Sequence, residues 1–188
     1  MFIQTEPTPN PATMKFLPGR TVMEAGTADF ATPEAATGRS PLAEALFAVP
    51  GVAAVFFGGD FVTVTKAPDA EWYLIKPAIL GAIMEHFTAG KPVMVAAAAA
   101  AVEGTEAVEA DDEVVTQIKE LLDTRVRPAV AQDGGDIVFH GFESGVVYLH
   151  MQGACAGCPS STATLKMGIE NMLKHYIPEV VEVRAVAM

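Results

Sequence analysis

The stretch GACAGCPSS, residues 153–161, holds both cysteines of the 188-residue chain, Cys155 and Cys158. Alternating apolar residues before this stretch predict a strand, and apolar residues at helical spacing after it predict a helix. Gly153 and Gly157 bracket and separate the thiols, so the backbone can turn sharply between the two elements. Backbone N–H groups at a helix N-terminus stabilise negative charge and lower the pKa of a nearby thiol. We therefore expect a loop that favours anionic sulfur.

The spacing of the two thiols points to metal or redox chemistry, because two cysteines are too few for a disulfide framework. Tetrahedral zinc and cubane iron–sulfur clusters usually need four ligands, and one chain supplies only Cys155 and Cys158. A two-fold dimer would solve this shortage, since each subunit would present the same pair at the axis. A site closed by so few ligands from each chain should also release its metal group readily.

Working outward from the loop, the second half of the chain predicts the order helix, strand, strand, cysteine loop, helix, strand. Acids at 111–113 favour a helix N-terminus, and apolar residues at helical spacing follow until the helix should end before Pro128. Residues 132–136, QDGGD, are typical of a turn. The remaining predicted elements are a hairpin with strands over 137–142 and 146–151, a helix over 164–176 and a strand over 180–186.

The first half of the chain mixes strand and helix signals. Prolines 7, 9 and 11 predict an opening with sparse regular structure. Ser40 before Pro41 predicts a capped helix that ends at Val49. Strands are predicted over 52–57 and 61–65, and Asp69 is the expected cap of a helix with an apolar stripe that ends near residue 90.

These patterns predict an α+β protein with two small domains, each a small, mainly antiparallel sheet packed with helices. The expected domains cover residues 1–94 and 111–188. Residues 95–110 are alanine-rich and then acidic, with nothing large to bury, and predict a flexible linker.

Composition excludes several classes of partner. The net charge is −11 and the isoelectric point is about 4.7, so the cationic surface that nucleic acid requires is missing. The longest apolar run, residues 93–102, is shorter than the roughly twenty residues of a membrane-spanning helix. The first residues resemble neither a secretory signal nor a transit peptide. We expect no membrane association and a bacterial cytoplasmic location, or the mitochondrial matrix if the chain is a processed form.

The motifs resemble one protein family. Arg127-Pro128, the stretch QDGGDI at 132–137 and the cysteine loop at 153–161 resemble the NifU-like C-terminal domain of Nfu-type iron–sulfur proteins, with the elements in the same order. The opening stretch QTEPTPNPATMKF, residues 4–16, resembles the N-terminal domain of that family.

This resemblance implies a scaffold or carrier rather than an enzyme. It implies that Cys155 and Cys158 of two subunits hold a [4Fe-4S] cluster between them, so that the loaded protein is a homodimer. The expected partners are an upstream cluster donor and the apo-proteins that receive the cluster. The family's N-terminal domain lacks ligands and is associated with partner recognition.

Alternatives with different chemistry remain open. A zinc-bridged structural dimer would use the same two cysteines. A thiol–disulfide oxidoreductase also uses Cys-x-x-Cys at a helix start, but it would need a βαβ setting rather than a hairpin before the loop. A ferredoxin-like electron carrier would normally bring four cysteines on one chain.

Other residues that can bind metals have simpler interpretations. Asp133 and Asp136 are too few for a calcium loop and are expected to form a turn. The isolated histidines His86, His140, His150 and His175 are expected on the surface or in the packing, and Met151, Met167 and Met172 as core or interface residues. No pattern predicts a conventional catalytic centre.

Overall fold

The computed structural model describes residues 1–95, 113–156 and 159–186. The chain separates into two compact units, Met1–Thr105 and Glu106–Met188. Each unit packs helices on a small sheet, so the predicted α+β class is confirmed. The predicted linker lies, apart from Val95, outside the described residues, and its bounds stay a prediction.

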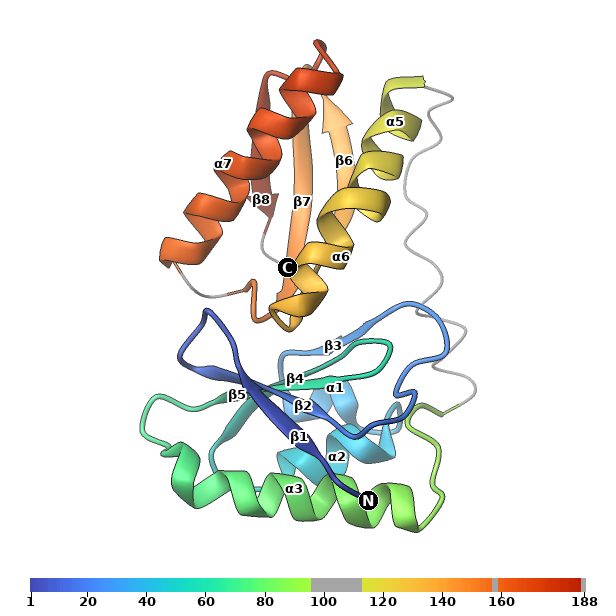
Figure 1. Cartoon of the computed structure of the whole chain (residues 1–188), viewed down its shortest axis with the longest axis vertical. Helices are drawn as coiled ribbons and strands as arrows, with labels where there is room; N and C mark the ends of the chain where they lie inside the picture. The colour runs from blue at the N-terminus through green and yellow to red at the C-terminus, as the bar shows by residue number, and fades with distance from the viewer. Residues whose placement is uncertain (96–112, 157–158, 187–188) are drawn as a thin grey trace. The chain divides into compact units, whose positions relative to one another are not determined.

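The first unit is a five-stranded antiparallel sheet whose helices lie on one face (Figure 1). Its strands, in the order β1-β2-β5-β4-β3 across the sheet, are β1 (Gln4–Pro7), β2 (Thr13–Leu17), β3 (Ala28–Phe30), β4 (Val52–Phe57) and β5 (Val62–Lys66). Its helices are α1 (Pro33–Ala36), α2 (Pro41–Phe47) and α3 (Trp72–Thr88). Ile79 and Ile83 of α3 are fully buried in the same core as Phe16 and Val62 of the sheet, which confirms the predicted apolar stripe.

The expectation of sparse structure at the start of the chain is wrong. β1 pairs with β2 from Gln4 opposite Leu17 to Pro7 opposite Met14. The turn between them is stabilised by Asn10, whose Oδ1 accepts a hydrogen bond from the Ala12 N–H at 3.0 Å. Pro7 can belong to β1 because β1 is an edge strand and Pro7 is its last residue.

The two predicted helix caps of the first unit have different outcomes. Ser40 caps α2 as predicted, and its Oγ accepts a hydrogen bond from the Ala43 N–H at 3.1 Å. The predicted Asp69 cap is wrong, because the chain still turns there, with the Ala70 N–H donating to the Ala67 carbonyl. α3 begins two residues further on, after Glu71, which makes no side-chain cap.

The second unit is a three-stranded sheet with its helices on one face (Figure 1). Its elements are α5 (Glu113–Leu121), the π-helical turn η1 (Leu122–Val126), α6 (Arg127–Gln132), β6 (Gly135–Glu143), β7 (Val146–Gly153), α7 (Pro159–Tyr176) and β8 (Glu182–Val186). β7 is the central strand, antiparallel to β6 and parallel to β8. The predicted hairpin is confirmed, and its two turn residues, Ser144 and Gly145, both have positive φ, as a tight hairpin turn requires.

The prediction that the first helix of this unit ends before Pro128 is wrong. Proline lacks an N–H group and its ring collides with the carbonyl four residues earlier in a regular α-helix. The chain avoids this collision with η1, in which the Arg127 N–H donates to the Leu122 carbonyl, five residues back. Pro128 then lies in the first turn of α6, where its missing donor costs little. The wider turn therefore lets the chain continue as a helix from α5 through η1 to the end of α6 at Gln132.

α7 begins at Pro159, which the loop sequence suits as an early helical residue, before the apolar spacing over 164–176 that predicted the helix. The apolar spacing that revealed this helix starts at Leu165, so its first turns carried no periodic signal. Because Pro159 opens the helix, the cysteine loop directly joins the end of β7 to the start of α7.

Candidate metal centre

The backbone around Cys155 is held by hydrogen bonds on both sides. Gly153 has φ 61° and turns the chain at the end of β7. The Ala154 N–H donates to the Gly134 carbonyl at 3.2 Å, and the Cys155 N–H to the Gln152 carbonyl at 3.3 Å. From α7, the Thr162 hydroxyl donates to the Cys155 carbonyl at 3.1 Å. Three elements thus position this cysteine, while Cys158 lies outside the described residues.

Cys155 is packed inside the second unit, with 6% of the residue's surface exposed. Gly135, the first residue of β6, lies directly against it. A Cβ atom added to Gly135 would lie 2.5 Å from Cys155 Sγ and 2.8 Å from the Gln152 carbonyl oxygen. Only a residue without a side chain fits this position. Of the two neighbouring glycines, Gly134 forms the predicted turn, with φ 81°, whereas Gly135 makes room for the thiol.

The expectation that the loop lowers the thiol pKa is wrong for Cys155. Burial, followed by the charges of Asp133 and Asp136, raises the pKa of this thiol to about 12. Both effects disfavour the thiolate. The metal-free protein therefore keeps Cys155 protonated near neutral pH, and a metal must displace its proton on binding.

Alkylation of Cys155 in a Cys158→Ser variant should therefore be slow. We expect iodoacetamide to react at pH 8 at least about tenfold more slowly than with an exposed thiol, because only the thiolate attacks. The alkylation rate should keep rising above pH 9, which is the ordinary pKa of a thiol. Intact mass against time at several pH values measures it, and the same variant unfolded in guanidinium is the control. A rate that levels off near pH 9 would contradict this expectation.

An ion pair between a partly exposed arginine and a buried acid lies next to the cysteine loop. Asp136 is 3% exposed, and its carboxylate accepts two hydrogen bonds from Arg127, Nε to Oδ1 at 2.9 Å and Nη2 to Oδ2 at 2.8 Å. The Ile137 N–H also donates to Oδ1 at 2.8 Å. The sequence interpretation of Asp136 as a turn residue is thus wrong, since it belongs to β6. The missed signal was an acid inside an apolar strand, which needs a cation as partner.

The other candidate ligands are not gathered around Cys155. Among the described residues, no three His, Cys, Asp or Glu side chains form a group that could hold a metal ion. His86 is buried in the first unit, where burial and the charge of Lys91 lower its pKa. The remaining candidates are His140 and His175, which are exposed, half-buried His150, Met151 in the core, Met172 packed against it, and exposed Met167.

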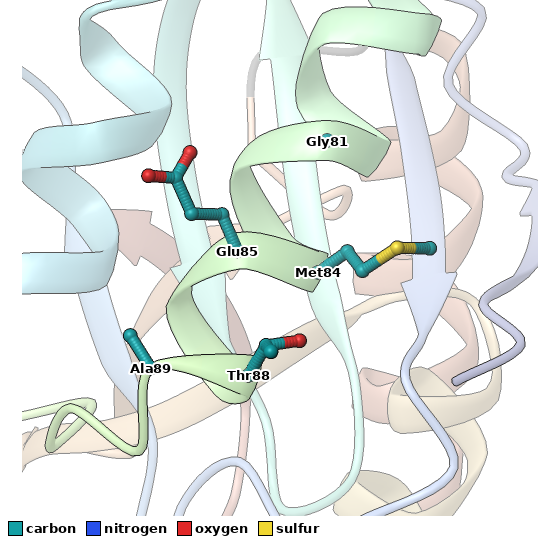
Figure 2. A pocket seen from close by; sticks show the side chains of 5 residues that line it. All are labelled: Gly81, Met84, Glu85, Thr88 and Ala89. Carbon is teal, nitrogen blue, oxygen red and sulfur yellow. The ribbon is translucent and has the colours of Figure 1, made fainter.

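A shallow groove lies on α3 of the first unit (Figure 2). The described residues that line it are Gly81, Met84, Glu85, Thr88 and Ala89. Glu85 is the one ionisable group among them, so the described lining offers a metal a single carboxylate. The groove contains none of the thiol chemistry found in the second unit.

None of the helices that the structure describes is long and apolar enough to cross a membrane.

Two protein-family models match separate parts of the chain, one within each unit. Residues 3–90 match the model described as "Scaffold protein Nfu/NifU N terminal", and residues 118–184 match the "NifU-like domain". The second match includes the cysteine loop and the Arg127–Asp136 pair.

Curated relatives match along nearly the whole chain. NifU-like protein 4, mitochondrial, of Arabidopsis thaliana is 56% identical over 182 residues, 96% of this chain and 64% of that protein. The human NFU1 iron-sulfur cluster scaffold homolog, mitochondrial, is 55% identical over 181 residues, 96% of this chain and 70% of that protein. The chain thus spans about two thirds of the length of these relatives.

Among solved structures, a NifU-like protein from Saccharomyces cerevisiae matches with a TM-score of 0.47 and 27% identity, over 51% of this chain and 86% of that chain.

Proposed function

Because the chain belongs to the Nfu family of iron–sulfur cluster scaffold proteins, we propose that it holds a [4Fe-4S] cluster through Cys155 and Cys158 of two copies. The observation that carries this proposal is the placement of Cys155. It lies in a loop that β7, α7 and the turn before β6 hold by hydrogen bonds, inside the unit that matches the NifU-like domain. Membership of this family indicates that the group held and passed on would be an iron–sulfur cluster.

The donor chemistry of the loop supports this assignment. Thiolates are the usual ligands of iron in such clusters, and a cubane cluster takes four of them. Each chain contains two cysteines, so two chains related by a two-fold axis complete the set. The protein would accordingly be a homodimer when loaded, and dimer formation and cluster binding would be linked.

The proposed partners follow from a scaffold role. A donor protein must supply the cluster, and apo-proteins that need one must receive it. A cluster shared at a subunit interface has few ligands from each chain, which favours transfer over permanent retention. The human relative is named as an iron-sulfur cluster scaffold, and we propose no catalytic reaction for this chain.

Anaerobic reconstitution of the full chain with iron and sulfide tests the proposal. We expect about four irons and four sulfides per dimer, with loading that doubles the mass in solution. Iron, sulfide and zinc analysis, combined with size-exclusion chromatography and light scattering, measures both quantities. Tightly bound zinc that iron cannot displace would contradict the proposal and favour the structural zinc dimer.

The oxidoreductase alternative makes a different prediction in the same experiment. It would give a metal-free monomer with a reversible Cys155–Cys158 disulfide. Such enzymes need an exposed, readily ionised first cysteine. Burial of Cys155 and the raised pKa of its thiol are observations against this alternative.

Two locations were expected from the sequence. The relatives are named as mitochondrial proteins, which supports a mitochondrial location for the proposed function over a bacterial cytoplasmic one.

A further inference from the structure

Asp136 is a buried carboxylate on β6, and its backbone pairs with Gln152, just before the cysteine loop. Its side chain is 4% exposed, whereas that of Arg127 is 37% exposed. The arginine therefore reaches from the surface onto the buried acid and binds both of its oxygens. A buried carboxylate needs a partner of this kind, because burying an uncompensated charge is costly.

Two backbone connections link this acid to the cysteine. Asp136 directly follows Gly135, whose α-carbon faces Cys155 Sγ so closely that no Cβ would fit. Across the sheet, Asp136 pairs with Gln152, whose carbonyl accepts the Cys155 N–H at 3.3 Å. Any negative charge left at Asp136 would therefore be felt at the cysteine sulfur.

The η1 turn sets the position of Arg127 relative to Asp136. Because the Arg127 N–H bonds five residues back to the Leu122 carbonyl, the chain rotates less per residue over η1 than in a regular α-helix, which changes the face on which Arg127 lies. Asp123, one turn earlier, accepts a hydrogen bond from Arg127 Nη1 at 3.1 Å. The guanidinium thus lies between two acids. A guanidinium stays charged at all relevant pH values, so Arg127 offsets the charge of the Asp136 carboxylate throughout that range.

A cluster held by four thiolates is itself anionic. Binding it at Cys155 brings negative charge towards a carboxylate that is already buried nearby, and the two repel each other strongly where water is excluded. We propose, on the basis of the function proposed above, that Arg127 is a positioning residue for the cluster, which neutralises Asp136 near Cys155 and so allows the protein to retain an anionic cluster.

The test compares Arg127→Gln, Asp136→Asn and the double variant in the full chain. Each protein is loaded anaerobically, and the rate at which iron passes to the ferrous chelator bathophenanthroline is followed by absorbance. Arg127→Gln should release iron about tenfold faster than the wild type, as expected for an outer-shell partner of a metal ligand. The double variant should return to within about twofold of Asp136→Asn, because no buried charge remains to be compensated.

Two further readouts separate charge compensation from a general effect on folding. The midpoint reduction potential of the bound cluster should shift to a more negative value in Arg127→Gln and return in the double variant, because loss of the Arg127 charge adds net negative charge near the cluster and so disfavours reduction. Arg127→Lys keeps the charge but loses the two-pronged geometry, and it should retain iron more like the wild type than like Arg127→Gln. Lys174→Gln, which removes a cation from the surface ion pair with Glu170 on α7, is the control for net charge.

The outcomes are distinct. If the double variant releases iron as fast as Arg127→Gln, or if Arg127→Gln releases it at the wild-type rate, the proposal is wrong. If Arg127→Gln does not fold, Asp136→Asn is compared with the double variant instead. These two proteins should release iron at the same rate, because removing Arg127 has no effect on retention once residue 136 is neutral. A difference between them would overturn the proposal. A wild-type protein that takes up no iron and sulfide would instead overturn the proposed function itself.

Discussion

Replacing Gly135 with alanine is expected to destabilise the second unit and to remove its ability to bind iron. The added methyl group would lie 2.5 Å from Cys155 Sγ, and the nearby Gln152 carbonyl and Cys155 N leave it no other space. Overpacking of this kind costs about 1–3 kcal/mol, which lowers the unfolding midpoint of a domain of this size by roughly 5–20 °C. Relief of the collision requires the thiol to move and the loop backbone at Gln152 and Cys155 to shift with it.

Calorimetry of the metal-free protein and iron analysis after reconstitution measure the two effects. Gly141→Ala is the matched control, because this glycine lies in the same strand, β6, and an added Cβ would have no atom within 4 Å. The contact would be less tight than the structure indicates if Gly135→Ala and Gly141→Ala unfolded at the same temperature and bound the same amount of iron.

Loss of either cysteine should abolish cluster binding and leave the fold intact. We expect Cys155→Ala and Cys158→Ser each to hold less than about a tenth of the wild-type iron, since two of four ligands per cluster disappear from the dimer. Alanine is chosen at Cys155 because a serine hydroxyl would be buried in the core. Iron and sulfide analysis after reconstitution measures the loss.

The far-ultraviolet circular dichroism of these metal-free variants should match that of the wild type, because the core of the second unit does not depend on the cluster. Met167→Ala removes an exposed sulfur from α7 and serves as the control. A loss of helicity in either cysteine variant would point instead to a metal that the fold itself requires. Full iron content in either variant would place the ligands elsewhere.

The elements that sequence patterns predicted correctly are those with local signals. Ser40 before Pro41 marks the start of α2, and Ser144-Gly145 closes the hairpin of the second unit. In both cases the residue types that fix the backbone lie within four positions of the feature they determine. Nothing from elsewhere in the chain was needed.

The elements that were missed depend on distant partners. β2 pairs with β5, about fifty residues later in the chain, and it is this pairing that makes the proline-rich opening part of a sheet. Likewise, Pro128 is a reliable helix breaker only in an α-helical register, and the η1 turn changes that register. A single sequence contains no short-range pattern that reveals either feature.

The same distinction holds for the candidate site. Cys155 and Cys158 stood out by type and spacing. Arg127, Gly135 and Asp136 lie in the motifs of the family resemblance, but the sequence did not show what they contact. Gly135 on β6 meets Cys155 in the loop after β7, and Arg127 on α6 meets Asp136 on β6. The pKa of the thiol was predicted in the wrong direction for this reason, since burial depends on what packs around the loop.

The parallel pairing of β8 with β7 has a consequence for the order of events in folding. α7 connects these strands, so the chain between them forms a closed loop that contains the cysteines. Until β8 docks, β7 has only β6 as a neighbour, and Val147 and Leu149 lack the cover that Val183 helps to provide. Such long-range pairing forms late. Assembly of the ligand loop would then be among the last steps of folding, so that a nascent chain is poorly suited to capture iron before its tertiary structure is complete.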